Sequence, residues 1–220
     1  MIVITKKLDR FSIFLLASFV LGDVFAQDLP NHHLPYIGLI GGYGSTTWDG
    51  LVPSNRNQNI AMNMSTPIAV EEGGNVWGVL AGYEFSPHFA VEVNYLKYPD
   101  AKVSFDVRNS MFAFDHGVAE FITKTEYVSM MGKIMLIIPN TKIRAYSGAG
   151  AANLHREDMI LDDWRVSPIF AVGLIYPFTK HLRGELSGDY TSGFGESQLN
   201  PADTYYPFLY SATVRVAYQF

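Results

Sequence analysis

The sequence predicts an all-β protein, an eight-stranded antiparallel up-and-down transmembrane β-barrel preceded by a cleavable signal peptide. Three observations lead to this fold class. Hydrophobic residues past position 35 recur with period 2 rather than 3.6. The connections between the predicted strands alternate between short and long. One alternate face of every predicted strand lacks Asp, Glu, Lys and Arg, although 17% of the chain is charged.

The N-terminus has the layout of a secretory signal peptide. Lys6, Lys7 and Arg10 supply a positive start, an apolar run follows at 11–22, and small residues precede a cleavage site after Ala26. An uncleaved anchor helix is the alternative, but the apolar run is too short to span a bilayer comfortably. We therefore expect residues 1–26 to be a signal peptide, 27–35 a periplasmic N-terminal leader, and 36–220 the barrel.

Eight segments have the alternation and the β-branched, aromatic and glycine content of barrel strands. In chain order they span residues 36–45, 75–85, 89–98, 126–138, 142–152, 165–178, 182–192 and 207–220. Alternation within 102–117 predicts that the third and fourth strands extend beyond the membrane. Pro168 lacks a ladder donor, so a bulge or locally broken pairing is expected there. The last strand must pair with the first, because a spanning sheet leaves no open edge.

The connections fall into two classes. Three are tight turns at 86–88, 139–141 and 179–181, and four are long and polar, at about 46–74, 99–125, 153–164 and 193–206. Short periplasmic turns and long extracellular loops are typical of outer-membrane barrels. A secreted β-sandwich has no reason to sort its loops in this way.

The face opposite the uncharged one carries four acids and four bases. These residues are Glu84, Glu92, Lys133, Arg144, Arg183, Glu185, Asp189 and Arg215. An eight-stranded barrel has an interior that side chains just fill, and a buried unpaired charge is costly. We therefore expect an interior plugged by ion pairs. A water-filled lumen lined by solvated charges is the alternative.

Aromatic residues mark both ends of the predicted strands. Tyr83, Phe85, Phe89 and Tyr176 fall near the short turns, and Tyr43, Trp77, Tyr95, Tyr190 and Tyr210 fall near the long loops. Two such levels are expected where aromatic rings meet lipid headgroups.

Two stretches resemble a known family. The segment RVSPIFAVGLIYPFTKHLRGELSGDY at 165–190 resembles the sixth and seventh strands of the OmpA transmembrane domain, and AGYEFSPHFAVEVNYL at 81–96 resembles its second hairpin. The terminal Tyr218-x-Phe220 is similar to the general signature of outer-membrane barrels. The resemblance covers about residues 36–220. It implies a bacterial outer-membrane location, contact with outer-membrane lipid and lipopolysaccharide, and recognition of Tyr218 and Phe220 by the barrel-assembly machinery.

The sequence also departs from this family. OmpA-type barrels hold an interior cluster of Glu, Lys and Arg that acts as a plug or gate, and Glu92 and Lys133 match it. Ile175 stands where an interior Glu is expected, and Glu185 stands where an interior Arg is expected. The resemblance therefore implies rearranged ion pairs, with Arg144, Arg183 or Arg215 supplying positive charge. The chain ends at its last strand, so a peptidoglycan-binding domain is not expected.

The composition excludes several classes of function. The chain has no cysteine and a net charge of −5, which excludes thiolate metal sites and argues against nucleic-acid binding. We expect no cofactor and no metal, since the adjacent histidines of NHH at 31–33 are a weak signal. Exposed loops on a rigid scaffold commonly bind partners. We therefore expect a structural and surface-interaction role, with a host or cell-surface ligand at the loops and little or gated conductance.

Two alternatives remain open at this stage. A lipid A-modifying barrel enzyme needs a serine–histidine–acid set near the outer rim. The local candidates are His155 beside Glu157 and Asp158, and His116 near Ser110. We expect no enzymatic activity, because neither cluster matches a recognisable motif. A channel for small hydrophobic solutes, with a lateral opening near Pro168, is the second alternative.

Overall fold

A computed structural model describes residues 34–52, 64–195 and 201–220. The predicted signal peptide, its cleavage after Ala26 and the NHH histidines lie outside the described residues. So does the leader up to residue 33. The two last leader residues, Leu34 and Pro35, already belong to the first strand, which therefore begins earlier than predicted.

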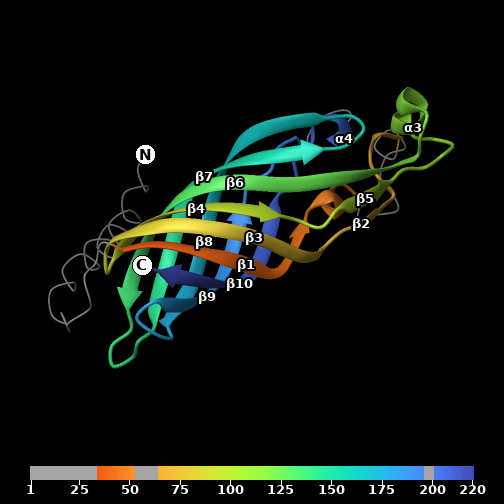
Figure 1. Cartoon of the computed structure of the whole chain (residues 1–220). Coiled ribbons are helices and arrows are strands. Elements are labelled where there is room, and N and C mark those ends of the chain that lie inside the picture. The colour runs from red at the N-terminus through yellow and green to blue at the C-terminus, as the bar shows by residue number, and fades with distance from the viewer. Residues whose placement is uncertain (1–33, 53–63, 196–200) are drawn as a thin grey trace, which may run out of the picture. The chain divides into compact units, whose positions relative to one another are not determined.

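Within the described residues, eight long antiparallel strands form a closed barrel (Figure 1). They are β1 (Leu34–Thr46), β3 (Gly74–Ser86), β4 (Phe89–Lys97), β6 (Glu120–Ile137), β7 (Arg144–Glu157), β8 (Asp162–Pro177), β9 (Leu182–Thr191) and β10 (Leu209–Gln219). Each strand pairs with the next along the chain. The seam joins β1 to β10, with Tyr36 opposite Gln219 and Ser45 opposite Tyr210. The predicted barrel and its closing strand are confirmed.

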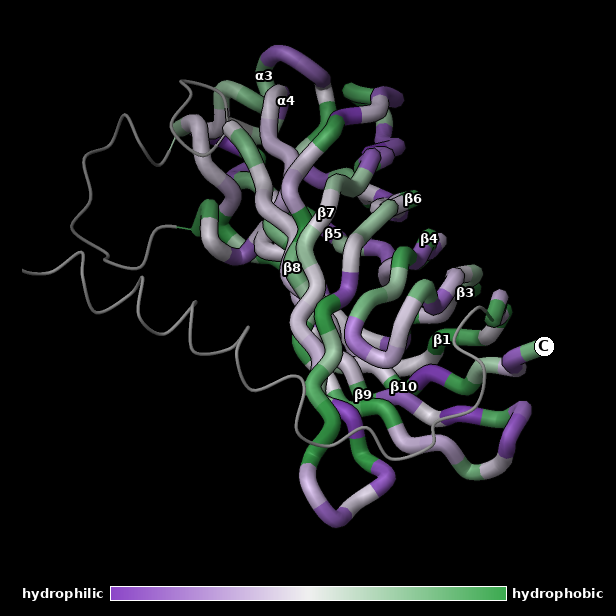
Figure 2. The backbone as a smooth tube through the Cα atoms, turned by 90° about the vertical axis from the view of Figure 1, so that its left-hand side faces the viewer, coloured by the Kyte–Doolittle hydropathy of each residue, from purple (hydrophilic) through white to green (hydrophobic). Residues whose placement is uncertain are grey.

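Side chains alternate across the barrel wall, as the period-2 pattern requires. On β10, Tyr210, Val214, Val216 and Tyr218 are exposed, whereas Arg215 is 1% exposed. Burial alternates in the same way along most of each of the other barrel strands, and Figure 2 shows that hydrophobic and hydrophilic residues are mixed along the wall. This arrangement puts apolar side chains on the outer wall and the charged residues inside.

The predicted loop at 153–164 is wrong. β7 continues to Glu157 and β8 begins at Asp162, so the connection is a short turn. The strands continue because Leu154 and Arg156 still face inward and are buried, and because the β7–β8 ladder runs unbroken to Glu157 opposite Asp162. β6 begins at Glu120, so the fourth strand extends outward as expected. The third strand does not, because β4 ends at Lys97 and the chain beyond it forms a separate short strand at 101–104 and a helix at 111–116.

The three remaining long connections all hold secondary structure. The short strands β2 (Ala69–Glu71) and β5 (Ala101–Ser104) extend the sheet beside the outer part of β6. The helix α3 (Met111–His116) begins at Ser110, whose hydroxyl accepts a hydrogen bond from the Ala113 amide. It ends at Gly117, whose φ of 72° suits glycine. The connections also contain the 3-10 turn η1 (Trp48–Leu51) and the one-turn helix α4 (Pro201–Thr204).

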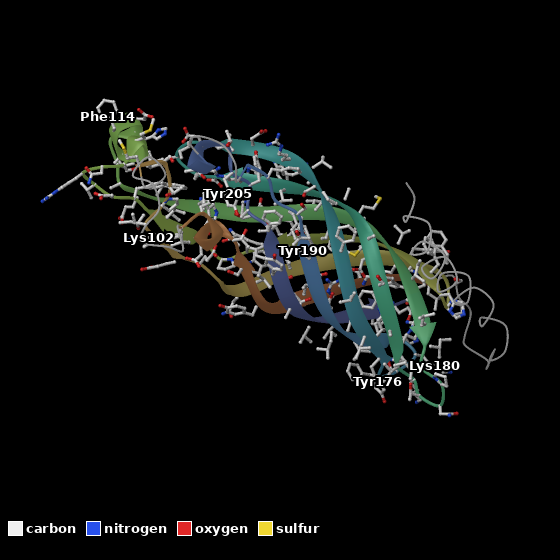
Figure 3. All side chains as sticks on the ribbon, turned by 180° about the vertical axis from the view of Figure 1, so that it is seen from behind. Lys102, Phe114, Tyr176, Lys180, Tyr190 and Tyr205 are labelled. Atoms are coloured by element: carbon white, nitrogen blue, oxygen red, sulfur yellow. The ribbon has the colours of Figure 1, made fainter. Side chains whose placement is uncertain are left out.

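Figure 3 shows the two ends of the barrel by labelled side chains. Tyr176 and Lys180 lie at the end with the tight turns, and Phe114 lies at the opposite tip, on α3. Among the described residues, no helix has the length and apolar character needed to cross a membrane.

Pro168 causes no bulge in the β7–β8 ladder, where it lies opposite Ala151. Pairing with β9 instead stops one residue later, at Ile169 opposite Thr191. The Pro168 carbonyl accepts a hydrogen bond from the Ser192 amide, so its nitrogen also points toward the β9 side. The proline therefore occupies the position where no donor is needed, and β8 continues outward beside β7 alone.

Candidate functional site in the charged barrel interior

Eight ionisable side chains point into the barrel from six strands. Glu84 lies on β3, Glu92 on β4, Lys133 on β6, Arg144 on β7 and Arg215 on β10, while β9 supplies Arg183, Glu185 and Asp189. All of these residues except Arg144 are at most 4% exposed, and the Arg144 side chain is 12% exposed. The predicted site residues thus gather in one buried region.

The part nearest the tight turns is built on Glu84. Both guanidinium nitrogens of Arg144 donate to its carboxylate, at 3.0 and 2.9 Å. Arg183 donates to the same carboxylate from β9. Such two-point contact between a guanidinium and a carboxylate is the strong and directional form of ion pair. It ties β3 to β7 and β9 across the barrel.

The central part is built on Glu92 and Glu185. Glu92 accepts hydrogen bonds from Lys133 at 2.7 Å and Arg215 at 2.9 Å. Lys133 also donates to Glu185 at 2.8 Å, and Arg215 lies 3.3 Å from Glu185. Arg215 reaches Asp189 at 2.6 Å with its other terminal nitrogen. Lys133 and Arg215 therefore each bridge carboxylates. Arg183, which pairs with Glu84, also lies 4.0 Å from Glu92, so the group of eight forms one connected network with zero net charge.

Two tyrosines complete the network, and sequence reasoning did not identify them. Tyr36 donates to Glu92 at 2.9 Å, and Tyr146 donates to Glu185 at 2.5 Å. The Arg183 guanidinium lies 3.4 Å from the centre of the Tyr36 ring. Gly82 makes room for that ring, because a Cβ there would come within 2.2 Å of it. Tyr36 and Tyr146 occupy strand positions that alternate with the outward-facing ones, and this position in the pattern could have identified them as interior residues.

The rearrangement expected from the family resemblance takes a specific form. Ile175 is buried and lies directly opposite Glu185 on the next strand. Glu185 therefore supplies the carboxylate, and Arg215 and Lys133 supply its positive partners. Burying charges in this way is tolerated only where each one has close partners, and each of the eight has at least one.

A second buried cluster caps the outer end of the barrel. It collects apolar side chains from several connections and from the outer part of β6: Trp48, Leu51, Ala101, Val103, Phe105, Phe112, Phe121, Ala202 and Tyr205. We call this set the outer cap. The stacked pair of Phe105 and Phe112, with ring centres 4.1 Å apart, forms part of it.

Arg156 holds the outer cap together. It is fully buried at the end of β7, pairs with Asp158 at 2.6 Å, and lies over the Trp48 ring at 4.7 Å. Its terminal nitrogens donate to the carbonyls of Tyr205 and Ala202 at 2.6 and 2.8 Å. Sequence reasoning did not identify Arg156, because a loop was predicted at 153–164 and no inward-facing strand position was assigned there.

Glu72 fastens the first connection to the cap. It accepts hydrogen bonds from the Thr46 hydroxyl at 2.5 Å and from the backbone amides of Trp48 and Asp49 at 2.9 and 3.3 Å. Burial raises the pKa of Glu72 above its ordinary value, and these hydrogen bonds oppose that shift.

The outer histidines do not join the local partners considered from the sequence. His155 lies on β7, not in a loop, and contacts Glu126 at 3.4 Å and Asp162 at 2.8 Å. Its ring stacks on Trp164 with centres 4.4 Å apart. His116 contacts Asp203 at 3.3 Å.

The neighbouring residues that the sequence offered as partners for these histidines form hydrogen bonds with other groups. Glu157 bonds Lys124, Asp158 bonds Arg156, and the Ser110 hydroxyl caps α3. Within residues 34–52, 64–195 and 201–220, no group of three or more histidine and acidic side chains is suited to a metal ion.

The histidines in two tight turns make the same contacts. His88 accepts the Met135 amide with its carbonyl at 2.8 Å, and its ring lies 3.1 Å from the Met135 carbonyl. His181 repeats this arrangement with Gln219, at 2.7 and 3.0 Å. Each turn is thereby fastened to the end of a neighbouring strand, and the second such contact holds the terminal strand.

The aromatic residues predicted at the membrane edges lie outward at both ends of the strands. Tyr43, Trp77, Phe85, Phe89, Tyr176 and Tyr210 are all more than 40% exposed. Neighbouring rings touch within each level, as with Tyr83 and Phe85 at 4.7 Å and Tyr190 and Tyr210 at 5.2 Å. Trp77 and Tyr95 form a further pair at 6.0 Å.

Comparisons with known proteins agree with this architecture. The model of the OmpA-like transmembrane domain matches residues 49–220. Among solved structures, the chain is similar to the outer membrane protein OprG from Pseudomonas aeruginosa, with 11% identity, a TM-score of 0.52, and coverage of 88% of this chain and 99% of that chain. It is also similar to Neisserial surface protein A, with 11% identity, a TM-score of 0.50, and coverage of 84% and 97%.

A comparison with curated proteins found no significant match. The two solved structures show the barrel fold, and the family model covers most of the chain. The chain therefore belongs to the OmpA-like transmembrane domain family and is a β-barrel of the outer membrane.

Proposed function

We propose that this barrel is a rigid membrane support for extracellular segments that contact a host or cell-surface ligand, and that the eight-residue ion-pair network closes its interior. The network carries the proposal, because its side chains cross the lumen and neutralise one another. Opening a continuous water path requires breaking several buried contacts, each of which leaves a charge without its partner.

Conductance tests the closed interior. In planar bilayers the wild-type protein should show little or no steady current. Replacing Arg144 and Glu84 with alanine removes the bidentate pair and its long side chains, and should increase conductance. A large, steady conductance of the wild-type protein would contradict the proposal and favour a porin.

The outer cap supports the surface role. Its core gives the extracellular segments a fixed shape, and it leaves Phe114 and Val107 exposed at the tip, at 88% and 77%. Rigid presentation lowers the entropy cost of binding. We expect that serine at both positions weakens attachment of protein-bearing cells to host cells, whereas Lys180→Ser at the opposite end leaves attachment unchanged. Equal attachment by all three proteins would remove this role.

The membrane-facing assignments belong to the same proposal. We propose that the two levels of outward aromatic residues contact lipid headgroups, that lipopolysaccharide and outer-membrane lipid surround the wall, and that the barrel-assembly machinery reads Tyr218 and Phe220. The arrangement of the outward rings supports the first assignment.

We propose no catalytic role. We also propose no transported hydrophobic solute, because β8 pairs with β7 from Asp162 to Ile175 and with β9 from Ile169 to Pro177. Mass spectrometry of lipid A from cells with and without the protein tests the first point. A changed acylation pattern would overturn it.

A further inference from the structure

The outer wall has a shallow, open depression with a volume of about 410 Å³ over β8, β9 and β10. Its main lining residues are Val172, Leu174, Leu186, Gly188, Ala212 and Val214. The floor is the cross-strand row in which Val172 lies opposite Gly188 and Gly188 lies opposite Ala212. Gly188 has no side chain and Ala212 has a short one, so the wall is thin at this row.

Larger side chains form the two sides of the hollow. The row toward the extracellular end consists of Phe170, Tyr190 and Tyr210, which are cross-strand partners. The row toward the tight turns consists of Leu174, Leu186 and Val214. Strands are about 4.8 Å apart, so three neighbouring strands give a groove of roughly 10 Å between the outer two. Tyr43, opposite Ala212 on β1, ends the groove on one side.

We propose that this groove seats one acyl chain of lipopolysaccharide, with the hydroxyls of Tyr190 and Tyr210 facing its polar end. The groove is continuous with the lipid-facing wall of a membrane-spanning barrel, so the medium beside it is hydrocarbon. Its aromatic side belongs to the level near the extracellular segments, which places it in the outer leaflet. A slender chain fills such a hollow at little cost, and aromatic hydroxyls are suited to the headgroup boundary.

A second copy of the barrel fits the groove less well. A twofold dimer would bring two identical hollows face to face and enclose a void between them. The surface of nine lining residues is also small beside the roughly 800 Å² per partner that stable interfaces bury.

Filling the groove tests the inference. A Cβ added at Gly188 would have Val172 as its nearest neighbour at 4.0 Å, so a side chain can begin at this outward position without a clash, and Gly188→Leu is the first test variant. Gly132→Leu is the matched control, because this outward glycine lies on β6, away from the groove, and its Cβ would meet Phe89 at an ordinary 3.6 Å. Ala212→Leu fills the same hollow from β10 and serves as the second test variant.

The measurement is lipid retention by native mass spectrometry. The full chain is extracted from membranes of lipopolysaccharide or of phospholipid alone, and migration on an unheated gel confirms folding. Wild type and Gly132→Leu should retain one lipopolysaccharide, and Gly188→Leu and Ala212→Leu should retain at least five-fold less. The seat is overturned if the filled variants retain it as well as wild type, if phospholipid is retained equally, or if filling the groove removes a dimer instead.

The inference deepens the proposal that lipopolysaccharide surrounds the wall, and the two fail differently. If neither the wild-type protein nor any variant retained lipopolysaccharide, both proposals would be overturned. Equal retention by the wild type and the three variants would overturn only the acyl-chain site. Neither outcome concerns the closed interior, which conductance tests separately.

Discussion

Among the residues of the barrel interior, Glu92 is the one whose replacement should lower the free energy of unfolding most. It is completely buried and accepts charged hydrogen bonds from Lys133 and Arg215. Glu92→Gln keeps the shape and removes the charge, which leaves the interior with an excess positive charge. A hydrogen bond to a charged group contributes about 1.5–3 kcal/mol, and breaking a buried pair from one side costs about 3–5 kcal/mol.

The expected loss is near the lower limit of that range. Lys133 keeps Glu185 at 2.8 Å, and Arg215 keeps Asp189 at 2.6 Å. We therefore expect Glu92→Gln to lower the free energy of unfolding by about 3 kcal/mol. Urea unfolding in lipid vesicles measures it, and with a slope of about 2 kcal/mol per molar the midpoint should fall by roughly 1.5 M.

Two further variants separate charge from packing. Adding Lys133→Met to Glu92→Gln restores neutrality, so the double variant should lose less than the sum of the two single losses by about 1–3 kcal/mol. Glu157→Gln is the matched control. Glu157 pairs with Lys124 at 3.0 Å, but both side chains are nearly half exposed, so the loss should stay below about 1 kcal/mol. Additive losses, or a Glu92→Gln loss no larger than that of the control, would refute the argument.

Three other outcomes are expected. Burial raises the folded-state pKa of Glu72. The contribution of Glu72 to stability is therefore fully present below the unfolded-state pKa and is lost as the pH rises through the folded-state pKa. Amide hydrogen exchange at Trp48, corrected for its intrinsic rate, should slow between pH 7 and pH 4 in the wild type and not in Glu72→Gln. His181→Ala should lower stability by about 1 kcal/mol through loss of its ring contact with Gln219, and urea midpoints equal to those of wild type would contradict the contact. Deleting Phe220, whose amide donates to the Pro35 carbonyl at 3.1 Å, should slow insertion into membranes more than it alters cell attachment, and insertion at the normal rate would argue against the assembly signal.

The alternation of side chains between the two faces of each strand was sufficient to predict which residues form the outer wall of the barrel. Val214 and Arg215 are adjacent in sequence and lie on opposite sides, because successive side chains in a strand alternate. The pairing partners were not predictable in the same way. The contact between Glu84 and Arg144 joins β3 to β7 across the lumen, and it depends on strand tilt and stagger, which local periodicity does not encode.

The outer cap escaped prediction for a related reason. Beyond the bilayer, outward positions such as Asn153 and Glu157 are exposed to water, so they are polar. The apolar-out pattern that marks a membrane strand is then lost, and the end of β7 looks like a loop. Only the inward residues Leu154 and Arg156 preserve the strand signal, and two positions are too few to define it.

The outer cap and the barrel interior have separate hydrophobic cores. The tip that carries Phe114, and the connection from β5 to α3 that contains Val107, belong to the extracellular segments and not to the membrane wall. Sequence changes at that tip, including short insertions, should therefore be tolerated without loss of the barrel. A lineage under immune pressure would be free to diversify this surface while its membrane segment stays constant, and an engineer would choose the same place to display a foreign peptide.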